Sequence, residues 1–355
     1  QYPHQTGVLG LSHGYEEGSD EFFGWDLSEP RRHASHLFRE AGYHTGLLGF
    51  QHETSFPERL GFDHIDMRFP LSRARQPFRR FLSDRPLGKP FFCQIGCDET
   101  HRPFDMHGTE PDDTKGIYVP PYLTDGPKTR EELAAFQGLV NSFDRSLDAL
   151  IGELKEAGLW DQTIFVLTTD HGLAMPRSKC TLYDPGIETM LIGRVPGGRS
   201  GAVCDHLISN VDILPTLLEL CGVSIPDWIS GSSFADALTG DATVPRSHIF
   251  AEKTYHSIYD PLRCARNKRY KYILHFEKIK YLEVPGDIRR RGAHQELSRH
   301  LDGPLPMEEL YDLESDPVET KNLVNNAEYG RVLSELRNEL HRWLHATEDP
   351  ILHGS

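Results

Sequence analysis

The stretch that decides the fold is TIFVLTTDHG, residues 163–172, in which an apolar run of strand character leads directly into Asp170 and His171. Lys179 follows shortly afterwards, just ahead of TLYDPG at residues 181–186. In an open α/β sheet, ligands bind outside the carboxyl ends of the strands. A carboxylate, an imidazole and an ammonium near one strand end therefore predict a site. The carboxylate suits a hard metal cation, and the ammonium suits an oxyanion.

Two earlier apolar runs end in the same way. The stretch GYHTGLLGFQH, residues 42–52, ends at His52, and PFFCQIGCDETHRPF, residues 90–104, carries His101 and Arg102 behind a buried-strand pattern. Asp-His-Gly alone could be a turn or a helix cap, and a lone histidine is often a structural residue. Three strand ends that each deliver polar side chains favour a shared site instead.

The rest of the pattern predicts helices and a change of character near residue 245. Apolar positions recur at helical spacing from 129 to 158, where a glycine predicts the end of the helix. A second amphipathic helix is predicted to begin near Asp212, with Pro215 in its first turn. The Pro-rich stretch 102–128 predicts a long surface loop. Beyond residue 245 we expect hairpin-like strands and a last helix, at residues 249–252, 270–274 and 329–345.

The composition is that of a large acidic enzyme body. The chain has 355 residues, of which 38% are hydrophobic, and this is enough to bury a sizeable core. Its formal net charge of −15 argues against a general affinity for nucleic acid or anionic polysaccharide, since phosphate and sulfate contacts need surplus Lys and Arg. The sequence contains no run of about 18 apolar residues that would predict a membrane span. Its six cysteines have no zinc-site spacing.

Six segments, taken in order, resemble the sulfatase family of the alkaline phosphatase superfamily, most closely its sulfamidase-like branch, which includes heparan N-sulfatase. The strand-end segments above are joined by YPHQTGV (2–8), SNVDILPTLL (209–218) and ELYDLESDPVETKNL (309–323). The resemblance covers nearly the whole chain. It implies an α/β, alkaline phosphatase-like fold with a mixed, mostly parallel sheet between helices. We expect residues 1–245 to form the catalytic α/β domain and residues 246–355 a smaller C-terminal α+β subdomain, with antiparallel strands and a terminal helix.

The resemblance places the catalytic nucleophile upstream of the chain. In the family it is a formylglycine, made from the first residue of a Cys/Ser-x-Pro-x-Arg motif that precedes the Tyr-Pro-His segment. The chain begins at Gln1, and none of its cysteines is followed by x-Pro-x-Arg. The paired aspartates that end the family's first strand would also lie upstream. We therefore expect an N-terminally truncated piece of a sulfatase, without its first strand and nucleophile, that is inactive as it stands.

The resemblance also implies roles for single residues. It makes Asp170 a ligand of a calcium ion, with His171 either a second metal ligand or a contact to the sulfate. Lys179 is the cation expected on the sulfate. His101 would contact the sulfate or protonate the leaving group, and His52 would hold the formylglycine hydrate and promote its collapse.

One departure from the family pattern bears on the substrate. The family usually has Lys two residues before the histidine that His52 matches, whereas this chain has Phe50. Because a cation that is missing from an oxyanion site weakens it, Arg102 or another basic residue would have to replace it. Otherwise the substrate and activity differ, or the site has degenerated.

The C-terminal subdomain is expected to contribute substrate contacts. The stretch EKTYHSIYDPLR, residues 252–263, resembles a segment of the sulfamidase-like branch that ends near the pocket. His256 and Arg263 are therefore candidates for recognising the sugar, and an ordinary polar hairpin loop is the alternative. The basic run at residues 289–291 is interpreted as a solvated loop rather than a polysaccharide track.

The predicted function is hydrolysis of sulfate esters or sulfamates, on a sulfated carbohydrate such as a glycosaminoglycan. The alternatives are a phosphodiesterase or phosphonate hydrolase of the same superfamily, and a non-catalytic pseudoenzyme that binds sulfated glycans. Family members are commonly exported or lysosomal, so we expect an exported or lysosome-like location, with any signal peptide upstream of Gln1. No nucleic-acid partner is expected, and the sequence does not specify the oligomeric state.

Overall fold

The computed structural model describes residues 1–10, 25–28, 32–240, 246–297 and 304–354. It divides into two compact units. The first comprises Gln1–Gly10, Pro120–Thr124 and Phe165–Ser355, and the second comprises Leu11–Val119 and Asp125–Ile164. Since the division does not fall at residue 245, the domain boundary inferred from the sequence stays a prediction. Each unit is described by itself.

The second unit is built on a parallel sheet, with strand order β2-β1-β3. Leu47 and Leu48 at the centre of β1 are completely buried, as expected for a parallel strand that is covered on both faces. Its helices and strands are α2 (Ala34–Glu40), β1 (His44–Gly49), η1 (Pro57–Leu60), β2 (His64–Met67), η2 (Leu71–Arg73), α3 (Arg75–Asp84), β3 (Phe91–Gly96), η3 (Met106–Gly108), α4 (Pro127–Glu156) and η4 (Trp160–Gln162).

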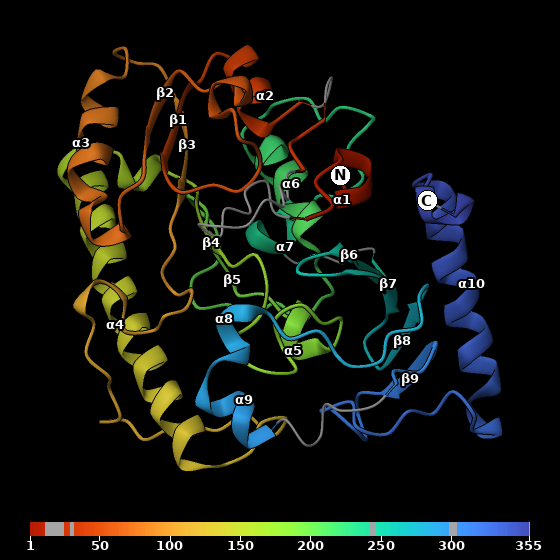
Figure 1. Ribbon diagram of the computed structural model, residues 1–355. Helices are drawn as coiled ribbons and strands as arrows, with labels where there is room; N and C mark the ends of the chain where they lie inside the picture. The colour runs from red at the N-terminus through yellow and green to blue at the C-terminus, as the bar shows by residue number, and fades with distance from the viewer. Residues whose placement is uncertain (11–24, 29–31, 241–245, 298–303, 355) are drawn as a thin grey trace. The chain divides into compact units, whose positions relative to one another are not determined.

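Helices α3 and α4 lie side by side in this unit (Figure 1). Arg75 and Arg79 of α3 direct their guanidinium Nε atoms to the carboxylate of Glu153 of α4, at 2.5 and 2.6 Å. Glu153 is buried, so the two arginines neutralise a carboxylate that would otherwise be costly to remove from water. The long helix predicted at residues 129–158 is thus confirmed within two residues at each end.

The first unit contains the remaining elements, including a four-stranded antiparallel sheet with order β6-β7-β8-β9. They are α1 (Pro3–Thr6), β4 (Phe165–Thr168), α5 (Asp184–Ile187), β5 (Leu191–Arg194), η5 (Asn210–Asp212), α6 (Ile213–Leu220), α7 (Ala235–Thr239), β6 (Ile249–Tyr255), β7 (Tyr259–Arg266), β8 (Tyr270–His275), α8 (Gly286–Arg289), α9 (Gly292–Leu297), β9 (Glu308–Asp312), η7 (Ala327–Tyr329), α10 (Gly330–Ala346) and η8 (Pro350–His353).

The two faces of the four-stranded sheet have different neighbours. Ala265 and Tyr272 point to one face and belong to a cluster with Leu336, Leu340 and Trp343 of α10, which runs along the sheet in Figure 1. Cys264 and Ile273 point to the other face and pack against Leu182 and Tyr183. This alternation is the period of two that a strand imposes on its side chains. Through its second face, the sheet supports the loop that follows Asp170.

The predicted elements beyond residue 163 are largely confirmed. Strand β4, helix α6 with Pro215 in its first turn, strands β6 and β8, and helix α10 all occur where the sequence pattern placed them. Strand β7 was not predicted, because Asp260 and Pro261 interrupt its apolar pattern. Pro261 is tolerated where the pairing of β6 with β7 shifts register, between Lys253 and Tyr255.

The strands agree with the predicted α/β class and with an antiparallel C-terminal part. The described strands form a parallel sheet, β2-β1-β3, a separate antiparallel pair, β4-β5, and the antiparallel C-terminal sheet. Among the described residues we find no helix whose length and apolarity together would carry it across a membrane.

Candidate functional site

Strands β1 and β3 bring His52 and His101 to the same edge of the parallel sheet. Gly49, the last residue of β1, pairs with Gly96, the last residue of β3, and both histidines follow these ends. The two chains remain close beyond the strands, since the Phe50 amide donates to the Gly96 carbonyl at 3.0 Å. A Cβ atom at Gly96 would lie 1.9 Å from the Phe50 carbonyl oxygen. Only glycine therefore permits this approach.

His101 is exposed, and its ring orientation is set by the backbone. Its Nδ1 lies 2.6 Å from the Arg102 carbonyl oxygen, which can only accept a hydrogen bond. Nδ1 therefore carries a proton, and Nε2 is the nitrogen that gains or loses a proton when the ring titrates. This is the arrangement that a general acid or base requires, with one nitrogen for orientation and the other for chemistry.

The other residues predicted near this edge have different environments. Arg102 is buried, forms an ion pair with Glu132 of α4 at 2.5 Å, and stacks over the ring of Phe104. Its guanidinium is therefore largely enclosed, and the predicted contact of Arg102 with the substrate stays a prediction. Phe50 is 39% exposed and lies against the ring of His52, with 4.5 Å between centroids. At this edge the aromatic ring of Phe50 takes the position that a cation has in the family pattern.

In the first unit, Asp170 and His171 form a pair of potential metal ligands directly after β4. Thr169 continues the pairing with the chain ahead of β5, because its Oγ1 accepts from the Met190 amide at 3.1 Å. The side chain of Asp170 is 86% exposed, and its Oδ2 lies 3.6 Å from His171 Nε2. His171 Nδ1 donates to the Gly172 carbonyl at 2.7 Å, which leaves the lone pair of a neutral ring on Nε2. Both ligand atoms are thus presented to the same volume.

This geometry fits a divalent cation. A metal-bound histidine characteristically donates its other ring N–H to a carbonyl or carboxylate, and His171 does so to Gly172. A carboxylate oxygen is the ligand that hard cations prefer. When bound, such a cation would neutralise negative charge on the substrate, and Asp170 and His171 would hold it from the side of this chain.

The segment from His171 to Ile187, here called the site loop, is closely packed on itself. The Gly172 amide donates to the Gly186 carbonyl at 2.9 Å, so the two ends of the loop meet. A Cβ atom at Gly172 would lie 1.8 Å from the Pro185 carbonyl oxygen. The glycine of the Asp-His-Gly motif is thus required by this contact as much as by any turn.

Lys179 projects from the site loop toward α8. Its side chain is 7% exposed, and its Nζ lies 3.2 Å from Asp287 Oδ2. The carboxylate of Asp287 is itself 23% exposed. A lysine ammonium is a compact cation of the kind that suits an oxyanion. The role of Lys179 in binding sulfate stays a prediction.

Charged residues of the C-terminal part hold the site loop in place. Arg266 binds Asp184 through two hydrogen bonds of 2.9 and 2.8 Å, and Lys271 lies 2.6 Å from the same carboxylate. Burial alone would raise the pKa of Asp184, but Arg266 and Lys271 lower it to about 2. Arg177 donates to the Val318 carbonyl at 2.6 Å and stacks over Tyr183. The site loop is therefore anchored at Arg177 and at Asp184.

His256 lies in the turn between β6 and β7 and remains partly exposed. Its Nδ1 is 3.0 Å from Ser257 Oγ and 3.5 Å from Glu283 Oε1. Glu283 is buried and also accepts from the Ser257 amide at 2.7 Å. The turn is thus anchored by one carboxylate, and the imidazole keeps an exposed surface that a sugar could contact.

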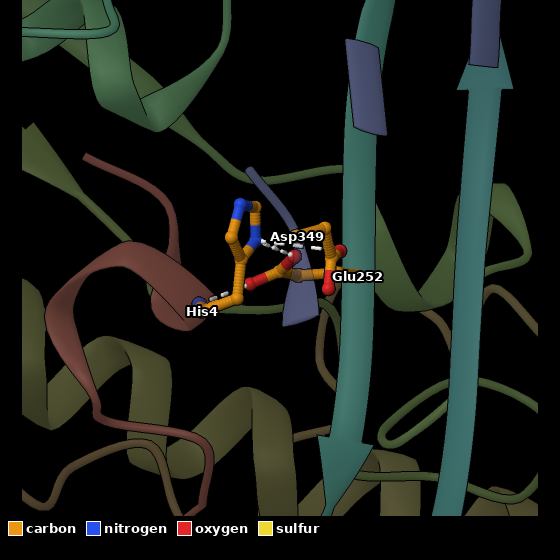
Figure 2. Close-up of side chains that lie close together, drawn as sticks. All are labelled: His4, Glu252 and Asp349. Atoms are coloured by element: carbon orange, nitrogen blue, oxygen red, sulfur yellow. Dashed lines mark hydrogen bonds and ion pairs between the residues drawn. The ribbon is translucent and has the colours of Figure 1, made fainter. Parts of the chain in front are cut away.

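Arg263 lies in a buried cluster of charged side chains, and its predicted contact with a sugar stays a prediction. It is 1% exposed, and its Nε lies 2.6 Å from Asp349 Oδ2 and 3.4 Å from Glu252 Oε2. Figure 2 shows these two carboxylates converging on His4, whose Nδ1 is 2.5 Å from Glu252 Oε2. The cluster ties α1 to β6 and to the end of the chain. The guanidinium of Arg263 is therefore enclosed by carboxylates in this structure.

Two groups of three potential ligands occur among the described residues, and neither contains Asp170. They are His4, Glu252 and Asp349, and Asp98, Glu99 and His107. In the first group, the Arg263 guanidinium already neutralises the carboxylates, so a dication would be placed beside a fixed positive charge. In the second, Glu99 accepts from the Leu71 amide at 2.9 Å. We assign a structural role to both groups.

The sequence did not identify the residues that support the site. Asp287 and Lys253 lie 108 and 73 residues from the loop residues that they contact, and Glu283 lies 26 residues from Ser257 in the turn that it anchors. Nothing in their local sequence marks them. Neither Cys180 nor Cys264 is readily deprotonated to a nucleophilic thiolate, because desolvation raises the pKa of Cys180 to about 12 and that of Cys264 to about 11.

Known protein families and relatives match this chain over most of its length. A family model described as Sulfatase matches residues 1–223, and one described as N-sulphoglucosamine sulphohydrolase, C-terminal, matches residues 171–291. An ulvan-active sulfatase of Formosa agariphila is 35% identical over 253 residues, which are 67% of this chain and 42% of that protein. The N-sulphoglucosamine sulphohydrolase of Homo sapiens is 24% identical over 403 residues, covering 98% of this chain and 79% of its own.

The solved structures agree on the fold. A 2-O GAG sulfatase superposes with a TM-score of 0.70 at 23% identity, and the match covers 99% of this chain and 80% of that one. This confirms the predicted alkaline phosphatase-like α/β fold. The chain spans less than half of the length of the ulvan-active relative. The family models, the relatives and the fold together establish that the chain belongs to the sulfatase family.

Proposed function

We propose that this chain carries most of the active site of a sulfuric ester hydrolase that acts on a sulfated carbohydrate, as an ester or a sulfamate. The observation that carries the proposal is the Asp170–His171 pair, which presents two metal-ligand atoms 3.6 Å apart at the end of β4, in a chain of the sulfatase family. The named relatives include sulfatases of ulvan and of N-sulphoglucosamine. They support a carbohydrate substrate without specifying the sugar.

In this proposal each candidate site residue has a stated role. Asp170 and His171 hold a divalent cation, for which calcium is the proposed identity because a carboxylate oxygen is a hard ligand. Lys179 places its ammonium on the sulfate and stabilises the charge that develops as one S–O bond forms and another breaks. His101 gives a proton from Nε2 to the departing oxygen or nitrogen, and thereby avoids the release of an unstable anion.

His52 completes the proposed cycle. A formylglycine of the kind found in the family would supply the oxygen nucleophile at such a site. His52 would hold a hydroxyl of that group and accept its proton. The ring contact with Phe50 orients His52 for this step. His256 is the proposed contact to the sugar.

The experiment is a sulfate-release assay on the protein expressed with the coding sequence upstream of Gln1. Sulfated oligosaccharides with O-sulfate or N-sulfate groups are the substrates, and phosphonate monoesters and phosphodiesters are the matched alternatives. Sulfate release supports the proposal. Turnover of the phosphorus esters alone would make the chain a phosphonate or phosphodiester hydrolase, and saturable binding of sulfated glycans without turnover would make it a pseudoenzyme.

The proposed location is outside the cytoplasm, in an exported or lysosome-like compartment. The support is the family, whose members are commonly found there. Fusing the natural upstream sequence to a reporter and measuring its export would test this.

A further inference from the structure

One lysine of the C-terminal sheet contacts both the site loop and the group that anchors His256. Lys253 in β6 is directed to the same face as Ala251, which packs with Leu182 of the loop. Its Nζ lies 3.2 Å from the Cys180 carbonyl oxygen, 2.5 Å from Asp260 Oδ2 and 2.9 Å from Glu283 Oε2. These three oxygens use all of the donors of an ammonium group.

We propose that Lys253 is a positioning residue for Lys179 and His256. Its ammonium fixes the backbone beside Lys179 directly, and it fixes the imidazole of His256 through Glu283. The inference rests on the proposed function, since it takes Lys179 and His256 to be contacts to the substrate.

The contact to Cys180 controls the backbone that carries Lys179. Cys180 has a φ of 67°, a left-handed conformation that a residue with a Cβ rarely adopts unless its surroundings enforce it. The Lys179 amide donates to the Leu173 carbonyl over a long distance of 3.3 Å. The Lys253 ammonium is a charged donor and forms the stronger restraint. It therefore holds the peptide that follows Lys179, and with it the direction of the Lys179 side chain toward Asp287.

The contact to Glu283 extends the same restraint to the β6–β7 turn. The two carboxylate oxygens of Glu283 have different partners. Oε2 accepts from the Lys253 ammonium, whereas Oε1 accepts from the Ser257 amide at 2.7 Å and lies 3.5 Å from His256 Nδ1. If Lys253 were lost, this carboxylate would be buried without its cation and would move toward water. The turn that carries His256 would follow it.

The competing explanation is that Lys253 merely stabilises the fold. Burying two carboxylates requires a cation, and removing it would cost stability whatever the loop does. Arg269 provides a matched control for that cost. It pairs with Asp312, which is 1% exposed and lies in β9 at the opposite edge of the sheet, and its contacts do not include the site loop.

The experiment compares Lys253→Met with Arg269→Met in the protein that includes its upstream sequence. Hydrogen–deuterium exchange is measured for peptides that cover residues 173–187, together with steady-state kinetics of sulfate release from 4-nitrophenyl sulfate. We expect Lys253→Met to raise exchange in this segment and to lower kcat/KM by about a hundredfold, the effect of misplacing a reacting group by about 1 Å. Arg269→Met should change neither quantity by more than about twofold.

A milder variant keeps the test usable if Lys253→Met does not fold. Glu283→Gln preserves the shape of the side chain, and Lys253 keeps its contacts with Asp260 and Cys180. The variant should therefore loosen the β6–β7 turn without changing the site loop. It should raise KM for a sulfated sugar and leave exchange of residues 173–187 unchanged.

The outcomes separate this inference from the proposed function. Equal exchange and equal kinetic loss in Lys253→Met and Arg269→Met would overturn the positioning role. If Lys253→Met raises exchange but the unaltered protein releases no sulfate, the contact of Lys253 with the site loop is supported and the sulfatase proposal is refuted. An increase in exchange with full retention of kcat/KM would show that the restraint exists and does not position a catalytic group, which also overturns the inference.

Discussion

Arg263 and Asp349 form a buried ion pair although 86 residues separate them in sequence. The guanidinium Nε lies 2.6 Å from Asp349 Oδ2, and Nη2 lies 3.2 Å from Oδ1. Neither side chain is more than 2% exposed. The pair joins strand β7 to the chain that leads into η8, and Glu252 links it to His4 of α1 (Figure 2).

Replacing Asp349 by Asn should destabilise the protein strongly. The guanidinium would remain buried and lose its bidentate partner, and breaking such a pair costs about 3–5 kcal/mol. Glu314→Gln is the control, because its carboxylate is 70% exposed beside Arg269 and such a pair contributes about 0–1 kcal/mol. Urea unfolding at neutral pH measures both. Equal midpoints for the two variants would contradict the structural role assigned to Arg263.

Two glycine substitutions, one in the site loop and one in helix α4, should have opposite effects on stability. Gly172→Ala would place a Cβ atom 1.8 Å from the Pro185 carbonyl oxygen, so the loop must shift, at a cost of about 1–3 kcal/mol. Gly152→Ala, in helix α4, meets no atom within 4 Å and should stabilise by about 0.5–1 kcal/mol. Thermal unfolding of both variants checks the signs. A neutral Gly172→Ala would show that the loop is not packed as described.

Acid should remove the stabilisation that Glu283 provides. Burial alone would raise the pKa of Glu283, but hydrogen bonding with His256 and the charge of Lys253 lower it to about 2, from an ordinary value of 4.5. A lowered carboxyl pKa stabilises the folded state above the unfolded pKa, and this contribution is lost as pH falls from about 4.5 toward 2. Glu283→Gln should therefore show a smaller fall in urea midpoint between pH 5 and pH 3. Parallel curves for the two proteins would contradict the assignment.

Metal binding should depend on Asp170 and His171. Treating the protein, with its upstream sequence present, with a chelator should abolish sulfate release, and added Ca²⁺ should restore it. His171→Ala should raise the Ca²⁺ concentration for half-maximal recovery at least about tenfold, because the ring shares the site with Asp170. Calorimetry with Ca²⁺ gives a readout without turnover. Unchanged Ca²⁺ affinity would assign His171 to the sulfate instead.

Features that depend on local sequence were predictable, and features that depend on contacts between distant segments were not. The strands that precede His52, His101 and Asp170 were predictable, since each is an apolar run of local sequence and its end marks the site. Strand β7 was not, because Pro261 is accommodated by a register shift that only the pairing with β6 reveals.

The sequence did not predict the environment of residues whose partners lie far away in the chain. Arg263 and Arg102 were predicted to contact substrate on the basis of their type and position in the chain. Their burial depends on Asp349 and Glu132, which local sequence does not connect to them. The same limitation hid Lys253, whose contacts are with Cys180 and Glu283.

The measurement that tests the central claim most directly is sulfate release by Lys179→Ala and His101→Ala variants of the protein with its upstream sequence. Lys321→Ala, an exposed lysine outside the site, is the control. We predict that each site variant lowers kcat at least about a hundredfold, the cost of removing one preorganised stabilising group, while the control retains the rate of the unaltered protein. If both site variants kept near-normal rates, Lys179 and His101 would not act on the sulfate, and the active site proposed for this chain would be wrong.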